Sequence, residues 1–419
     1  MPVMALLEYY TTPGYTLLFL IKKDHPEPYV FALSSSVLKT VSEATLSQAI
    51  QRMLIDFHGL PHDWDKPENL AHYRRLLSLP PAVGNARKRT QGIRQDRLYD
   101  DRFDYRLSYL EQLSAALLPQ PVRELIADCE LLCIVPHGPL HSLSFAGLLW
   151  SENEYLIERF GLCYAPSASV LKHCLTKNPR RSQPAAFVES CLIVAMAAAE
   201  DLDPLELEED GKDLAGLFQQ YHPDSKLTQL VGPVATQTFK AASKKEVLVE
   251  LPAHQLIHIA CHGFFGLETD VPDPLNSGIL VSDGQERGSV YSLSNFRVGT
   301  AERNTITARE IWNLRMQAEL IVLRACSSGR TQVRPGDELI GLVRALLHAG
   351  SASLLASLWN VNKRSSRLLL SSFYRHWLNA AARLPKWKAF RLAQLELLRQ
   401  KEYSHPYHWA SFALIGDWQ

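Results

Sequence analysis

Short, fully apolar segments alternate with helical patterns over the second half of the chain, and this alternation limits the fold more than any other feature. The apolar segments are SCLIVAMAA, QLIHIACHG, AELIVLRACSSG and ASLLASLWNV. Helical patterns lie between them, among them LEEDGKDLAGLFQQY and DELIGLVRALLHAG, where we expect Gly350 to end the helix. Strands that are apolar on both faces are buried, so the pattern predicts an α/β fold whose mostly parallel central sheet is covered by helices.

The first half of the chain has a different pattern. Residues 4–33 contain short β-prone runs separated by turn residues, which predict a meander of strands, and residues 38–118 have mainly helical periodicity. Residues 176–186 are rich in Pro and charge, as inter-domain linkers are. We therefore expect two regions, residues 1–180 and residues 187–419, which agrees with the two or three domains expected for this length.

Charge and composition narrow the class of protein. Lys plus Arg and Asp plus Glu number 44 each, so no net field points to nucleic acid. Apolar residues make up 46% and charged residues 21%, which is ordinary for a globular protein. Seven cysteines fit a reducing compartment, and the N-terminal sequence has neither a signal peptide nor a run of ~20 apolar residues. We expect a cytoplasmic protein that binds neither nucleic acid nor membrane.

Two of the predicted strands end in reactive side chains followed by small residues. QLIHIACHGFF ends at His262 and Gly263, and ELIVLRACSSGR ends at Cys326. Because parallel strands place their carboxyl ends at one sheet edge, we expect the His and the Cys to lie close together. An imidazole can take the thiol proton and create the attacking thiolate, while the backbone amides of Gly263 and Cys326 can bind the oxyanion. The alternative is a buried core cysteine at the end of a strand.

The neighbouring Cys261 and a metal site are rival interpretations. Adjacent residues on a strand point to opposite faces, so we expect Cys261 in the core rather than beside His262. His254, His258, Cys261 and His262 lie in a strand context, where the helical spacing of zinc ligands does not apply. The chain also has no Gly-rich phosphate loop and no Cys-pair zinc pattern. We expect no metal and no organic cofactor.

Candidates for a substrate pocket are less sharply defined. The carboxylates of Asp283, Asp337 and Glu338 could hold a basic side chain of a substrate, which would be the P1 residue if that substrate is a peptide, and Trp359 could form a pocket wall. A simpler interpretation makes Asp283 a turn residue, places the other two carboxylates at a helix N-terminus and buries the Trp in the core. Residues 283–305 are the best candidate for a loop that moves before the dyad is assembled.

Six segments in order carry a resemblance to a known family. They are HIACHGFF, NSGILVSDG, ITAREIWNL, LIVLRACSSGR, GDELIGLVRALLHAGSASLLASLWNV and HPYHWASFALIGDW. Together they resemble the CHAT family, which is grouped with caspases, separases and gingipains. The resemblance implies a caspase-like α/β sandwich and peptide hydrolysis, with the catalytic pair at His262 and Cys326. IVPHG at 134–138 echoes IACHG at 259–263, which indicates a degenerate, pseudoprotease copy in the first region, with His137 in a structural role.

The resemblance also implies a biological setting. We expect a bacterial cysteine endopeptidase that cleaves specific proteins in defence or programmed cell death, with a gasdermin-like pore former as one candidate substrate and an activating protein partner. Two alternatives stay open. One is a catalytically silent CHAT scaffold, against which the intact His262 and Cys326 argue, and the other is a different thiol hydrolase on a doubly wound sheet.

Overall fold

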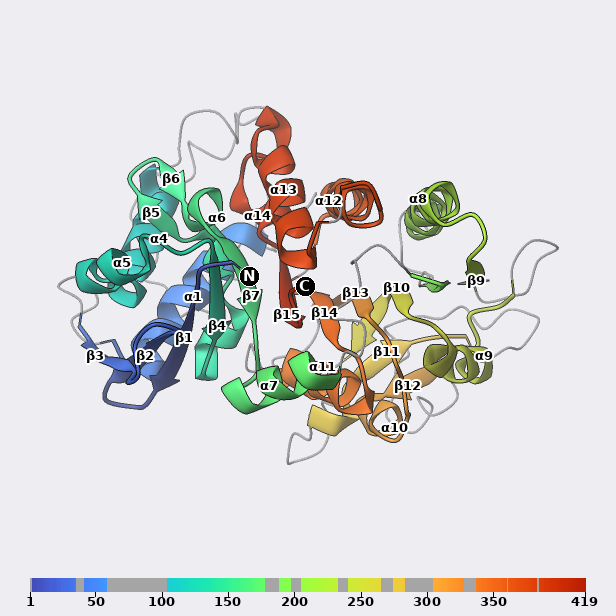
Figure 1. Cartoon of the computed structure of the whole chain (residues 1–419), viewed down its shortest axis with the longest axis horizontal. Coiled ribbons are helices and arrows are strands. Elements are labelled where there is room, and N and C mark those ends of the chain that lie inside the picture. The colour runs from blue at the N-terminus through green and yellow to red at the C-terminus, as the bar shows by residue number, and fades with distance from the viewer. Residues whose placement is uncertain are drawn as a thin grey trace, which may run out of the picture.

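The chain folds around one large sheet with helices on both faces (Figure 1). The computed structural model describes residues 2–34, 41–58, 104–177, 188–196, 205–232, 240–264, 274–282, 304–327, 337–359, 361–382 and 384–419. Within this part of the chain, 13 strands form the sheet in the order β12-β11-β10-β13-β14-β15-β7-β4-β1-β2-β3, with β8 and β9 joined to it through β10. Most of the paired strands run parallel, so the predicted α/β class with a mostly parallel central sheet is confirmed.

The N-terminal strands form the predicted meander at one end of the sheet. They are β1 (Met4–Thr11), β2 (Thr16–Lys22) and β3 (Tyr29–Leu33), which pair antiparallel. Buried and partly buried residues alternate along β1 and β2, because one face of the meander packs on the core. β1 then pairs in parallel with β4 (Leu131–Val135), and β4 with β7 (Gly161–Tyr164). A separate hairpin joins β5 (Leu149–Ser151) and β6 (Glu154–Tyr155).

The C-terminal strands include the parallel part that the apolar segments predict, formed by β8, β9, β10, β13 and β14, and three strands with antiparallel pairings, β11, β12 and β15. They are β8 (Ser190–Ala195), β9 (Lys226–Val231), β10 (Leu256–Phe264), β11 (Gly278–Leu280), β12 (Thr305–Thr307), β13 (Leu320–Ser327), β14 (Ser353–Ser357) and β15 (Phe412–Gly416). β15 pairs antiparallel with β14 and parallel with β7, so one continuous sheet passes through both halves of the chain. The expected division into residues 1–180 and 187–419 stays a prediction.

Helices cover the two faces of the C-terminal part of the sheet. Figure 1 shows α8 (Leu205–Tyr221), α12 (Lys363–Trp377), α13 (Lys386–Leu398) and α14 (Pro406–Trp409) above it, and α7 (Ala168–Lys177), α9 (Lys244–Glu250), α10 (Ala308–Trp312) and α11 (Asp337–Ala349) below it. The N-terminal half adds α1 (Glu43–His58), α4 (Asp104–Leu117), α5 (Gln120–Ile126) and α6 (Leu156–Arg159). Short 3-10 turns occur at Gly138–Ser142, Phe145–Gly147, Leu251–Ala253, Pro274–Asn276 and Lys401–Tyr403.

Local sequence explains where α11 ends. Gly350 follows the helix at φ +124°, in the left-handed region, and a Cβ there would overlap the carbonyl group of Met316. The predicted helix end at Gly350 is therefore confirmed. Among the described helices, none combines the length and the apolar character needed to cross a bilayer.

Candidate active site

The residues predicted to form the dyad occupy paired positions on neighbouring strands. β10 and β13 run parallel, and His262 lies directly opposite Cys326 in their register. Both positions are close to the carboxyl ends of their strands, and adjacent strands are about 4.8 Å apart. Residues opposite each other in a parallel pair belong to the same face of the sheet. The two side chains lie outside the described part of the structure, so the catalytic roles stay predictions, while the register gives the two residues the placement that a dyad requires.

The other predicted site residues are placed less completely. Gly263 pairs with Ile279 of β11 on one side and with Ser327 of β13 on the other, so its backbone lies inside the sheet. Asp337 is the first residue of α11 and Glu338 the second, as the helix N-terminus interpretation predicts, but their side chains lie outside the described part. Asp283 and most of the stretch 283–305 also lie outside it. Any role of these residues in binding a substrate therefore stays a prediction.

Trp359 is held by the C-terminal segment. Its side chain is buried, and its Nε1 donates a hydrogen bond to the carbonyl oxygen of Tyr407 at 3.3 Å. The neighbouring His408 is also buried, and its Nδ1 lies 3.0 Å from the hydroxyl of Ser365 in α12. These contacts give the indole a packing role, and the predicted pocket wall at Trp359 remains a prediction.

A layer of polar side chains lies on the same sheet face as the predicted dyad, and the sequence analysis missed it. His258 is four residues before His262, and its Nδ1 lies 2.8 Å from the hydroxyl of Tyr374 in α12. Arg324 is two residues before Cys326, is buried, and donates a hydrogen bond from Nη2 to the carbonyl oxygen of Lys363 at 3.1 Å. An Arg in an otherwise apolar strand, LIVLRACS, was the sequence signal that could have revealed this layer.

Arg324 adds a buried guanidinium to the strand that carries the predicted nucleophile. Residues two apart on a strand are separated by about 6.6 Å and share a face. A cation close to a thiol stabilises the thiolate relative to the thiol. The hydrogen bond to Lys363, the first residue of α12, also ties this helix to β13 just below the predicted site.

His258 is a poor candidate for the general base. Burial lowers its pKa to about 4, because the protonated imidazole would lose its hydration inside the protein. Its Nε2 is buried and has no hydrogen-bond partner among the described residues, while Nδ1 contacts Tyr374. The ring is therefore neutral near pH 7 and held in place, which leaves His262 as the candidate base on this face of β10.

Other cysteines are unsuited to nucleophilic chemistry. Cys261 is buried on the opposite face from His262, as predicted. Burial raises the pKa of Cys129 to about 11, and it also raises the pKa of Cys163 and Cys191 above the usual range. A buried thiol with a raised pKa forms little thiolate at neutral pH. The rings of His254 and His258 are likewise engaged in hydrogen bonds within the protein.

His137 follows β4 and contacts two residues of β1. The Nδ1 atom of His137 lies 2.9 Å from the hydroxyl of Thr11, and the imidazole lies against the ring of Tyr10 with 4.8 Å between centroids. These contacts connect β4 with β1 and agree with the structural role expected for this histidine.

This sheet, with a His and a Cys on paired strand ends, places the protein in the class of caspase-like cysteine-peptidase folds. The chain belongs to the CHAT domain family, whose model matches residues 107–417. It is 28% identical over 308 residues to human Tetratricopeptide repeat protein 28, an alignment that covers 68% of this chain and 12% of that protein. The chain therefore spans only a small part of the length of this curated relative.

The fold is also found in a solved structure of separase. The yeast (Saccharomyces cerevisiae) separase in the separase-securin complex matches with a TM-score of 0.55 and 12% identity, covering 99% of this chain and 30% of that one. The Arg-specific cysteine proteinase gingipain R, the RgpB protein of Porphyromonas gingivalis, matches with a TM-score of 0.43 and 10% identity, covering 74% of this chain and 67% of that one. At this identity the separase match supports the fold and no more.

Proposed function

We propose that this protein is a cysteine endopeptidase in which Cys326 is the nucleophile and His262 the general base. The observation that carries the proposal is the register of β10 and β13, which sets His262 directly opposite Cys326 near the carboxyl ends of both strands. The buried guanidinium of Arg324 on the same face supports it, because a nearby cation favours the thiolate.

The reaction follows from these roles. His262 takes the proton of the Cys326 thiol, and the thiolate attacks the carbonyl carbon of the scissile peptide bond. The backbone amides of Gly263 and Cys326 are the proposed donors to the oxyanion. The imidazolium then gives its proton to the leaving amine, and a thioester with Cys326 remains. His262 deprotonates a water molecule that attacks the thioester, which releases the new carboxyl group and restores the thiol.

The wider biological role rests on the family resemblance. The hypotheses of this kind are a gasdermin-like substrate, an activating protein partner and a part in bacterial defence or cell death. A cytoplasmic location is a separate hypothesis, which the seven cysteines favour. The human relative named above is a eukaryotic protein, and its name refers to tetratricopeptide repeats. A catalytically silent scaffold is the second candidate function, since the same sheet can serve as a binding module without turnover.

Mapping of new protein N-termini by mass spectrometry tests the proposal. Wild type, Cys326→Ala and His262→Ala are each incubated with a cell extract and with a peptide library, and Cys261→Ala is the matched control because this neighbouring thiol is buried on the opposite face. We expect wild type and Cys261→Ala to produce the same cleavages, and the other two variants to produce none above background. Preference for Arg or Lys at P1 would favour the carboxylate pocket of Asp283, Asp337 and Glu338.

Two outcomes would contradict the proposal. Cleavage that persists in Cys326→Ala would assign the nucleophile elsewhere. The second outcome is that the wild-type protein cleaves nothing and that its Cys326 reacts with iodoacetamide at pH 7 no faster than a free cysteine does. This outcome would favour the catalytically silent scaffold.

A further inference from the structure

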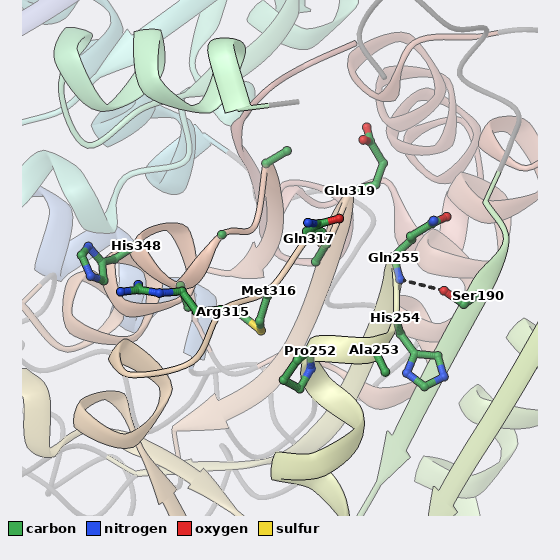
Figure 2. A pocket seen from close by; sticks show the side chains of 14 residues that line it. Ser190, Pro252, Ala253, His254, Gln255, Arg315, Met316, Gln317, Glu319 and His348 are labelled. Carbon is green, nitrogen blue, oxygen red and sulfur yellow. Dashed lines mark hydrogen bonds between the residues drawn. The ribbon is translucent and has the colours of Figure 1, made fainter. Parts of the chain in front are cut away.

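A cavity opens at the sheet edge opposite the predicted dyad. Its volume is about 370 Å³, and it lies where β8, β10, β13 and β14 begin (Figure 2). The residues that line it belong to the turn before β10, the extended segment 315–319 before β13, and the end of α11. The volume falls in the range of protein ligand sites, roughly 300 to 1,000 Å³.

The segment before β13 presents free polar groups to this cavity. Along residues 315–318 exposed and buried residues alternate: Arg315 and Gln317 are exposed, and Met316 and Ala318 are buried. This is the alternation of a β-strand. Met316 and Ala318 bond the end of α11 and the start of β14 through their backbones. Arg315 and Gln317 make no hydrogen bond or ion pair with any described residue, in the backbone or the side chain.

Among the residues that line the cavity, Arg315 supplies a positive charge. Glu319 is neutralised by an ion pair with Lys386, so its carboxylate does not offset the guanidinium of Arg315. Figure 2 shows Arg315 and His348 at the same side of the cavity. The His348 ring stacks on Trp312 with 3.8 Å between centroids and 11° between planes, which adds a flat aromatic surface to the rim. A guanidinium without an ion-pair partner is suited to a carboxylate.

We propose that this cavity is a docking site for an extended acidic peptide segment. The free backbone groups of Arg315 and Gln317 would pair with the peptide as an added strand does, and the Arg315 guanidinium would bind a carboxylate side chain. The six-residue advance from Leu256 to His262 corresponds to about 20 Å along β10, so the docking site and the dyad are separate. The idea that this peptide belongs to a protein substrate rests on the proposed peptidase function, whereas the binding itself does not.

Binding is tested on the Cys326→Ala protein, which removes proteolysis from the measurement. The probe is a fluorescein-labelled octapeptide of alternating Ala and Asp, compared with its Ala and Asn counterpart by fluorescence anisotropy. We expect the Asp peptide to bind, the Asn peptide to bind at least tenfold more weakly, and Arg315→Gln to weaken Asp-peptide binding at least tenfold. Arg399→Gln, which removes an exposed guanidinium just after α13, is the matched control and should change nothing. Circular dichroism verifies that each variant is folded.

Two results would overturn the docking site. One is no measurable binding of the Asp peptide, and the other is equal binding by the Arg315→Gln variant. For any cleaved substrate identified above, we expect Arg315→Gln to raise KM without changing kcat. Cleavage without peptide binding would refute the docking site and leave the peptidase proposal intact. Peptide binding without cleavage would support the docking site and contradict the peptidase proposal.

Discussion

The buried ion pair between Lys386 and Glu319 should respond asymmetrically to loss of either partner. The Lys386 side chain has 0% of its surface exposed, and Glu319 retains 19%. Lys386 also lies in the first turn of α13, where the helix dipole disfavours a cation. The ammonium therefore depends on Glu319 for compensation, whereas the carboxylate still reaches water.

Replacement by Met at either position gives the matched comparison. Glu319→Met leaves a buried ammonium without its carboxylate, which should lower the free energy of unfolding by about 3 to 5 kcal/mol. Lys386→Met leaves a carboxylate that water can partly solvate, and the expected loss is about 1 to 2 kcal/mol. The double variant buries no unpaired charge, so it should be more stable than Glu319→Met alone.

Urea unfolding at pH 7, followed by tryptophan fluorescence and by circular dichroism, measures these three differences. The reasoning is refuted if Lys386→Met loses as much stability as Glu319→Met, or if the losses of the two single variants simply add in the double variant. Simple additivity would mean that Lys386 of α13 and Glu319, just before β13, do not interact.

Three further perturbations have outcomes that the structure fixes. Gly161→Ala should destabilise the protein by about 1 to 3 kcal/mol, because the added Cβ would overlap the Trp387 ring; an unchanged melting temperature would contradict this. Tyr374→Phe should cost about 1 to 3 kcal/mol in urea unfolding, since it removes the hydroxyl that contacts Nδ1 of the buried His258, and a loss below the error of the measurement would be the opposing result. The free energy of unfolding should fall as the pH drops from about 6.5 toward 4. Burial lowers the pKa of His258 and His408 to about 4, so over this range the unfolded chain binds these protons and the folded protein does not. The expected slope is up to about 1.4 kcal/mol per pH unit for each ring. A free energy of unfolding that stays constant across this pH range would show that these rings are not buried neutral.

Periodicity and composition were enough to predict the main elements. The apolar segments that contain His262 and Cys326 became β10 and β13, and DELIGLVRALLHAG became α11 with Gly350 just after it. These features are local: a strand buried on both faces needs apolar residues throughout, and the residue after a helix favours glycine when its φ is positive. The class of fold followed because such strands and helices have few ways to pack.

Only the tertiary structure determined how these elements come together. The placement of His262 opposite Cys326, the insertion of β15 between β14 and β7, and the burial of Arg324 depend on contacts between residues far apart in the chain. Strand order and register are chosen by the packing of the whole core, because a pattern that repeats every two residues cannot specify which strand is the neighbour. For the same reason the cavity at Arg315 could not be predicted: its walls come from the start of β8, the turn before β10, the segment before β13 and the end of α11, which meet only when the sheet is complete.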